Sequence, residues 1–240
     1  MKISGKKILI TGGATGIGVG LAQRFIEDDN TVIICGRRES SLQEAKARLP
    51  MLITTTCDLS IESQRSGLFN WIAKNHSDLA ILINNAGIQQ WMSIDDDNFY
   101  SRAKEELTIN VEAPLHLNTL FMKLKSLEMI MNVTSGLSFT PLTKTPVYSA
   151  TKAFLHSYTI SLRKLLEPKG IDVIEIIPPA LNTDLGGKGL HDAAPPVSDF
   201  IEAAFKQLDE GKKELTFGFS EKMAMASPDE LRMAFQRMNP

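Results

Sequence analysis

The sequence of 240 residues is poor in cysteine, in charge of one sign and in long apolar runs. Its two cysteines, Cys35 and Cys57, have no metal-ligand spacing around them, so we interpret both as reduced, buried small hydrophobic residues and expect no metal. The formal net charge of −2 gives no reason to expect nucleic acid or an anionic membrane surface as a partner. No apolar stretch approaches the roughly 20 residues of a membrane span, and the N-terminus lacks the apolar region of a signal peptide. We therefore expect a cytoplasmic protein.

The chain does contain an alternation of apolar runs and helical patterns, with no repeat or linker that would divide it. We expect strands near residues 7–11, 31–35, 52–56, 79–83, 128–134, 171–177 and 214–219. We expect helices near residues 17–28, 39–48, 61–75, 98–125, 147–167 and 197–209. This order predicts an α/β fold over residues 1–240: a single Rossmann-like domain whose doubly wound parallel sheet carries helices on both faces. A ligand of such a sheet binds at the carboxyl ends of the strands, where the strand order reverses.

Three polar residues, Ser135, Tyr148 and Lys152, are separated by twelve and then three intervening residues. A tyrosine and a lysine four positions apart project from one face of a helix. An ammonium about 4 Å from a phenol contributes about 4 kcal/mol at an effective dielectric of about 20, which lowers the phenol pKa of about 10 by about 3 units. The tyrosine could then exchange protons near neutral pH while the serine holds a substrate oxygen. The triplet predicts a site for a carbonyl or a carbinol, although Tyr-x-x-x-Lys alone is also common on solvated helix faces.

A glycine-rich turn follows the first apolar run, where residues 11–18 read TGGATGIG. Glycine permits the backbone angles of a tight turn and the close approach of a pyrophosphate. The helix that begins there offers unpaired N–H groups to an anion. The spacing differs from the Gly-x-Gly-x-x-Gly fingerprint of long-chain dinucleotide-binding proteins, and a plain turn between a strand and a helix is the alternative interpretation.

Together these features resemble the short-chain dehydrogenase/reductase family over nearly the whole chain. Residues 11–18 are similar to the family's cofactor turn, and residues 84–87, which read NNAG, are similar to its motif after the fourth strand. Asn110, Ser135, Tyr148 and Lys152 fall where the family has its catalytic tetrad.

Two departures from the family pattern are visible. Ala180 stands where a glycine usually follows the proline, and the stretch before Ser135 is a few residues short. Neither departure removes a catalytic group.

The choice of cofactor depends on the end of the second strand, where Arg37 and Arg38 come first and Glu39 comes later, at the start of the next helix. An acidic residue here would bind the ribose hydroxyls of NAD, whereas an arginine would pair with the 2′-phosphate of NADP. We therefore expect NADP(H) to be preferred, with NAD(H) possible. Thr15 stands where many NADP-preferring relatives carry a basic residue, and the alternative is that the arginines are simply solvated.

The resemblance also implies the remaining cofactor contacts. Asp58 matches the family's adenine contact, and Thr183 matches the threonine that holds the nicotinamide carboxamide. In addition to Tyr148 and Lys152, the residues expected to bind the cofactor are Gly12, Thr15, Gly16, Ile17, Gly18, Arg37, Arg38, Asp58, Leu59, Asn85, Ala86, Gly87, Pro178, Ala180 and Thr183.

The reaction that the resemblance implies is hydride transfer between nicotinamide and a small carbonyl or secondary alcohol. Tyr148 would be the general acid and base, Lys152 would lower its pKa and bind the nicotinamide ribose, and Ser135 would orient the substrate oxygen. Asn110 would help to hold a water between Lys152 and solvent. The alternative is a non-catalytic sensor or scaffold of the same fold, but such a protein need not keep both Tyr148 and Lys152.

Expectations also follow for segments outside the cofactor site. Residues 184–197 correspond to the family's substrate lid, and residues 220–240 form a methionine-rich C-terminal extension that we expect to cover the core or a partner subunit. The resemblance implies a homodimer or homotetramer built from the two long helices, and Phe154 and Tyr158 would suit that face or the core. His191 and Trp91 could line the cleft, whereas His116 and His156 are more typical of packing.

Overall fold

The computed structural model describes residues 2–240. Seven strands in that range form one sheet in the order β3-β2-β1-β4-β5-β6-β7, and every pairing is parallel. The strands are β1 (Lys7–Thr11), β2 (Thr31–Gly36), β3 (Ile53–Thr56), β4 (Leu79–Asn84), β5 (Met129–Val133), β6 (Asp172–Ile177) and β7 (Glu214–Thr216). The doubly wound fold class is confirmed, and the strand order reverses between β1 and β4.

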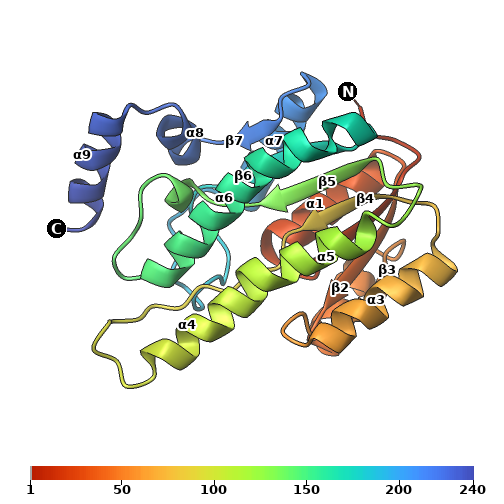
Figure 1. Cartoon of the computed structure of the whole chain (residues 1–240), viewed down its shortest axis with the longest axis horizontal. Helices are drawn as coiled ribbons and strands as arrows, with labels where there is room; N and C mark the ends of the chain where they lie inside the picture. The colour runs from red at the N-terminus through yellow and green to blue at the C-terminus, as the bar shows by residue number, and fades with distance from the viewer. Residues whose placement is uncertain (1) are drawn as a thin grey trace.

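Helices cover both faces of the sheet (Figure 1). They are α1 (Gly16–Glu27), α2 (Glu39–Arg48), α3 (Glu62–Asn75), α4 (Phe99–Leu107), α5 (Ala113–Phe121), α6 (Pro146–Leu166), α7 (Val197–Asp209), α8 (Phe219–Ala224) and α9 (Pro228–Met238). Helices α1, α2 and α7 contribute to the core cluster on one face. Helices α3, α5 and α6 contribute to the cluster on the other face.

The strands are buried on both faces because helices cover both, and this explains their near-continuous apolar sequences. In β1, Ile8 and Ile10 belong to the cluster of α1, α2 and α7, whereas Leu9 between them belongs to the opposite cluster. All three side chains are fully buried. The alternation of strand side chains thus fills two cores from one apolar run.

Two expected elements differ in the structure. The helix expected over 98–125 consists of α4, a π-helical turn at Thr108–Glu112 and α5, and it ends at Phe121. The strand expected over 214–219 ends at Thr216 because Gly218, with a φ of 55°, turns the chain into α8. The C-terminal extension 220–240 contains most of α8 and all of α9.

Both cysteines are buried and unpaired, as expected. Burial raises the pKa of the Cys57 thiol to about 11, and burial also raises that of Cys35, so neither is a thiolate at neutral pH. Across residues 2–240 there is no group of three or more histidine, cysteine or acidic side chains placed to hold a metal ion. In the same range, no helix combines the length and apolar character that a membrane crossing needs.

Candidate active site

The carboxyl ends of β1, β4, β5 and β6 open onto one cleft of about 1260 Å³. This exceeds the roughly 300–1,000 Å³ of common small-ligand pockets, so the cleft has room for a dinucleotide together with a substrate. The expected site residues that line it are Gly12, Thr15, Gly16, Ile17, Arg37, Arg38, Asp58, Leu59, Asn85, Ala86, Gly87, Ser135, Tyr148, Lys152, Pro178, Ala180 and Thr183. Two others, Gly18 and Asn110, lie behind its wall.

The glycine turn between β1 and α1 fits a pyrophosphate. Gly12 and Gly16 have φ angles of 62° and 54°, and a residue with a side chain would be strained in this conformation. A Cβ on Gly18 would lie 2.3 Å from the Gly12 carbonyl oxygen, so only glycine allows the helix to start this close to the strand. Thr15 precedes α1 without capping it through its side chain. The first N–H groups of the helix therefore remain available to an anion in the cleft.

Asn85 and Thr11 join β4 to β1 at the point where the strand order reverses. The Asn85 amide nitrogen donates to the carbonyl oxygens of Thr11 and Gly12, at 2.9 and 3.1 Å. The Thr11 hydroxyl accepts from the backbone N–H groups of Asn85 and Ala86. The Asn85 side chain thus joins β4 to the glycine turn at the floor of the cleft.

The end of β2 forms the other end of the cleft, where three arginines outnumber the two acidic side chains, Glu44 and Asp58. Arg37 and Arg38 are exposed and line the cleft, together with Arg48 from α2. Glu39 instead accepts hydrogen bonds from Thr56 at 2.5 Å and from Gln43 at 2.6 Å, so its carboxylate is engaged away from the cleft. The sequence did not predict Arg48 as a cleft residue, because it lies at the end of α2, a whole helix after the second strand.

Asp58 lies beside these arginines at the end of β3. Burial opposes the ionisation of its carboxyl, but hydrogen bonds from Ser60 and the charge of Arg37 outweigh that effect and lower its pKa. The Asp58 carboxylate accepts from the Ser60 backbone N–H at 2.9 Å and from the Ser60 hydroxyl at 2.7 Å. An ionised acceptor at this position fits an amino group such as that of adenine.

Ser135, Tyr148 and Lys152 meet at the ends of β5 and the first turns of α6. Ser135 lies close enough to Tyr148 to lower its pKa, and the Lys152 ammonium lies 5.6 Å from the centre of the Tyr148 ring. All three side chains are less than 10% exposed but line the cleft. The Lys152 ammonium donates to the Val133 carbonyl oxygen at 2.8 Å, which fixes its side chain against the end of β5.

The expected lowering of the Tyr148 pKa by Lys152 is wrong for the protein without ligands. Burial raises the pKa of Tyr148, and the Ser135 hydrogen bond offsets only part of that rise. Burial also lowers the pKa of Lys152 to about 8. The cation is directed at a carbonyl oxygen rather than at the phenol, so its charge does little for the phenolate. Tyr148 is therefore a protonated phenol at neutral pH, ready to donate.

Asn110 is buried in the π-helical turn between α4 and α5 and supports the cleft wall from behind. Its amide oxygen accepts from the Ile88 N–H at 2.9 Å, and its amide nitrogen donates to the Ile88 carbonyl at 2.8 Å and to Thr151 at 3.1 Å. A Cβ on Gly87 would lie 3.3 Å from the Asn110 oxygen and 3.5 Å from the Lys152 nitrogen. Asn110 thus positions the backbone that faces Lys152, while the water expected there stays a prediction.

Comparison with known proteins gives the family. A family model described as short chain dehydrogenase matches residues 6–193. An uncharacterized oxidoreductase DltE of Bacillus subtilis is 40% identical over 250 residues, covering 100% of this chain and 98% of that protein. The chain belongs to the short-chain dehydrogenase/reductase family. It is an oxidoreductase of that family, as the resemblance indicated.

Solved structures agree with the fold of this dehydrogenase/reductase. A short chain dehydrogenase from Burkholderia cenocepacia, in complex with NADP, superposes with a TM-score of 0.85 at 22% identity, covering 99% of each chain. A relative from Burkholderia phymatum, in complex with NAD, has a TM-score of 0.83 at 15% identity and covers 100% of this chain and 97% of that one. At these identities the similarity establishes the fold.

This family member holds a buried carboxyl, Glu106, that the sequence did not single out. Glu106 is 0% exposed, and one carboxyl oxygen accepts from the Gln90 N–H at 2.5 Å while the other has no partner. Burial raises the pKa of Glu106 to about 7, although the Gln90 N–H and Arg102 oppose the rise. A negative charge on Glu106 adds to the raised pKa of Tyr148.

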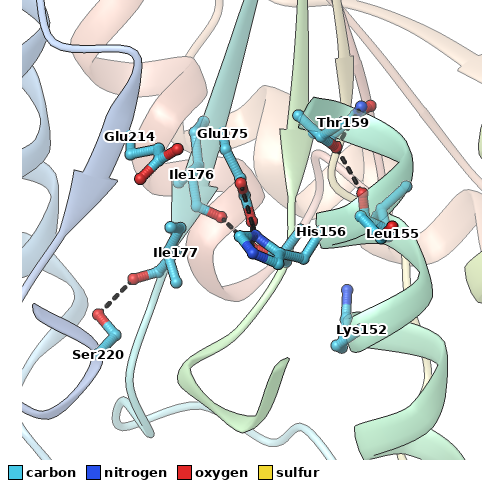
Figure 2. Close-up of polar contacts among 12 residues, drawn as sticks. Lys152, Leu155, His156, Thr159, Glu175, Ile176, Ile177, Glu214 and Ser220 are labelled. Atoms are coloured by element: carbon cyan, nitrogen blue, oxygen red, sulfur yellow. Dashed lines mark hydrogen bonds and ion pairs between the residues drawn. The ribbon is translucent and has the colours of Figure 1, made fainter. Parts of the chain in front are cut away.

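A second buried acid, Glu175 of β6, pairs with His156 one turn beyond Lys152 on α6 (Figure 2). The His156 Nδ1 lies 2.9 and 3.0 Å from the two Glu175 carboxylate oxygens. The Thr134 hydroxyl donates to the same carboxylate at 2.6 Å. The hydrogen bond to Glu175 raises the pKa of His156 despite its partial burial. His156 is thus a structural histidine, as expected, and His116 likewise accepts a hydrogen bond from Arg65 at 3.1 Å.

Proposed function

We propose that this protein is an NADP(H)-dependent oxidoreductase that transfers a hydride between nicotinamide and a small carbonyl or secondary alcohol. The proposal is supported above all by the convergence of Ser135, Tyr148 and Lys152 on the wall of one cleft large enough for both partners. When bound, the nicotinamide supplies or accepts the hydride. The chain itself supplies the proton, the orientation of the substrate oxygen and a site from which water is largely excluded.

In this proposal Tyr148 transfers the proton and Ser135 orients the substrate oxygen. The hydroxyl of Ser135 donates a hydrogen bond to the substrate oxygen, and the Tyr148 phenol gives its proton to that oxygen during reduction. In oxidation the same phenol oxygen takes the proton back. Because burial raises the pKa of Tyr148, the phenol carries its proton throughout the physiological range and is in the form that donates during reduction. Lys152, held against the Val133 carbonyl one helical turn from Tyr148, binds the ribose.

The first test is Tyr148→Phe, which removes the proton donor and keeps the ring. We expect kcat for the reduction of a simple ketone by NADPH to fall by about 100-fold or more, because general acid catalysis contributes about 10²–10⁴-fold. The affinity for NADPH, measured by its fluorescence on binding, should change little. A matched Tyr158→Phe variant, on the same helix but outside the cleft, should keep full activity. A Tyr148→Phe enzyme with most of its kcat would contradict the assignment.

The preference for NADP(H) over NAD(H) is proposed from the charges at the adenine end. Arg37, Arg38 and Arg48 line this part of the cleft, while Glu39 is held by Thr56 and Gln43. A phosphate on the ribose would meet cations there, and a bidentate arginine contact is among the stronger polar interactions. The solved relative that holds NADP and the one that holds NAD show that the fold accommodates either cofactor.

The cofactor proposal predicts that Arg37→Asp reverses the preference. The new carboxylate would repel a 2′-phosphate and accept from the ribose hydroxyls, so kcat/KM with NADPH should fall by about 10-fold or more while that with NADH rises. Lys46→Asp makes the same change of charge on α2 outside the cleft lining and should leave the ratio unaltered. An unchanged NADPH to NADH ratio in the Arg37 variant would show that another residue selects the cofactor.

We also propose that residues 1–240 act as one domain in a homodimer or homotetramer, with residues 184–197 as the substrate lid. In support of the lid, Asp184, Leu185 and His191 line the cleft. A Cβ on Gly186 would lie 3.6 Å from Gln89 and from the Trp91 indole nitrogen. The lid and the segment after β4 thus meet across the mouth of the cleft.

A further inference from the structure

The chain after β7 returns to the substrate end of the cleft and is anchored there twice. The first anchor is Ser220, which is fully buried. Its hydroxyl donates to the Ile177 carbonyl at 2.5 Å and accepts from the Phe217 N–H at 3.0 Å. Figure 2 shows the first of these contacts, at the end of β6. A Cβ on Gly136 would lie 3.2 Å from the Ser220 Cα, so α8 packs directly against the backbone beside Ser135.

The second anchor is Asn239, at the end of α9. Its side-chain oxygen accepts from the Thr143 N–H at 2.7 Å, and its nitrogen donates to the Pro141 carbonyl at 3.1 Å. The same nitrogen donates to Phe235 within the helix at 2.9 Å. The C-terminus therefore lies against the loop between β5 and α6 (Figure 1), which connects Ser135 to Tyr148.

The hydrogen bonds of Asn239 matter because α9 has little apolar packing of its own. Ala234 is the one buried residue of that helix within the described chain, and Met233 is 54% exposed. A capping box between Ser227 and Glu230 begins the helix, so its two ends are defined by polar contacts. Loss of the contacts of Asn239 would release the end of α9 from the loop.

Between the two anchors the wall of the cleft is apolar. Phe219 and Met238 from the C-terminal segment line it, as do Leu137 and Leu142 from the loop after β5. The arginines of the cleft lie at the opposite end, beside β2. A charged substrate tail would find no partner among these four side chains, whereas an alkyl or aryl group would bury apolar surface against them.

We propose that residues 218–240 form the wall that selects the substrate, with Met238 as its contact residue and Asn239 as the residue that positions it. The substrate class is then a carbonyl or carbinol that carries an apolar group of several carbons. This inference rests on the proposed function, because it places the reacting oxygen at Ser135 and Tyr148. It changes the expectation for the C-terminal extension from covering the core or a partner subunit to facing the substrate.

The test uses a series of 2-alkanols, from butanol to decanol, bound to the full-length protein saturated with NADPH. A reduced cofactor cannot oxidise an alcohol, so the dissociation constant is measured without turnover, by NADPH fluorescence or calorimetry. For the wild type we expect the affinity to rise about three- to fourfold for each methylene. Met238→Ala and Asn239→Ala should flatten this slope for the longer alcohols and leave 2-butanol unaffected. Met225→Ala, on the same segment but 83% exposed and outside the cleft, is the control.

The outcomes separate this inference from the proposed function. If the affinity rises with alkanol length equally in the wild type and in both variants, residues 218–240 do not select the substrate. The same conclusion follows if the affinity of the wild type does not rise with length. A wild type that shows the slope and its loss in the variants, yet reduces none of the matching 2-alkanones, keeps the wall and overturns the proposed reaction. A protein that binds neither NADPH nor any alkanol overturns both.

Discussion

Lys152 is an ammonium group that the protein keeps almost completely out of water. It is 4% exposed, its ionised form has the Val133 carbonyl as hydrogen-bond acceptor, and burial lowers its pKa from 10.5 to about 8. Burying this ammonium in its charged form at neutral pH lowers the free energy of unfolding by about 3 kcal/mol, because each unit of pKa shift corresponds to about 1.4 kcal/mol. Such a cost is typical of residues placed for chemistry rather than for stability.

The prediction for this residue is that Lys152→Met stabilises the cofactor-free protein while it abolishes turnover. We expect the free energy of unfolding near pH 6 to rise by about 1–3 kcal/mol, with part of the gain offset by the lost hydrogen bond to Val133. The folded pKa lies below the unfolded one, so wild-type stability increases as the pH rises from about 8 to 10.5. The difference between the two proteins should therefore disappear over that range in urea titrations. A Met variant less stable than the wild type at every pH would contradict this account.

At the scale of residues, the spacing of the motif predicted where its side chains lie, but it did not predict their pKa values. The interval between Tyr148 and Lys152 placed both on one face of α6, and the structure brings them together with Ser135. The pKa of the tyrosine depends on burial and on the direction of the lysine, and neither is visible in the spacing. No sequence pattern predicted that Glu106 is buried. The charged segment KEEL of α4 is typical of a solvated helix face, and only the folded chain places the Gln90 N–H on this carboxylate.

At the scale of elements, the His156–Glu175 pair joins α6 to β6 directly behind the site. Glu175 is 0% exposed, and its partners are His156 on α6 and Thr134 at the end of β5. Glu214 on β7 and Arg163 on α6 act on His156 from a greater distance, the former raising and the latter lowering its pKa. Three elements are therefore stabilised by one buried carboxylate.

The pair predicts a pH-dependent loss of stability in His156→Gln. The pKa of His156 is raised in the folded state, so the stability from its charge is fully present below about pH 6.5 and is lost as the pH rises through the raised pKa. We expect the variant to lose about 1.5–3 kcal/mol at pH 6 and clearly less at pH 9, measured by urea unfolding. Thr134→Val removes the neutral donor to the same carboxylate, and its effect should hardly change over this range. A pH-independent loss in His156→Gln would mean that packing against Phe139 matters more than charge.

The elements that the sequence did not predict are those decided by local backbone geometry. The π-helical turn at Thr108–Glu112 interrupts a continuous apolar periodicity and is what brings the Asn110 amide onto Ile88. The end of β7 depends on the positive φ of Gly218, and glycine in an apolar stretch is compatible with several outcomes. By contrast, periodicity placed the other strands and α7 to within one or two residues, because their burial repeats along the chain.

At the scale of the whole molecule, α6 exposes large apolar side chains on the surface away from the sheet. Phe154, Ile160 and Leu165 are 44%, 47% and 68% exposed, and Phe154 stacks on Tyr158 with ring centres 6.4 Å apart. Leu107 at the end of α4, 45% exposed, lies on the neighbouring helix of the same face, as Figure 1 shows for α4 and α6. Phe154 therefore lies at the surface rather than in the core, and its expected role in a subunit contact stays a prediction.

This surface supports the final prediction, that α6 carries the subunit contact of a homodimer or homotetramer. Phe154 and Leu165 lie on one face of the helix, and burial of their exposed apolar area on association is stabilising by about 25 cal/mol per Å². Phe154→Glu combined with Leu165→Glu should place two carboxylates in each half of the contact and lower the mass in sedimentation velocity to that of one chain.

The control and the stability measurement distinguish association from misfolding. Met51→Glu changes an apolar side chain that is 75% exposed before β3, on a different part of the sheet, and should leave the wild-type mass unchanged. If α6 is the contact, the Tm of the wild type should rise with protein concentration and that of the double variant should not, because association stabilises only the folded state. A wild type that sediments as a single chain at all concentrations would show that the apolar surface of α6 serves another purpose, since residues 2–240 leave it exposed.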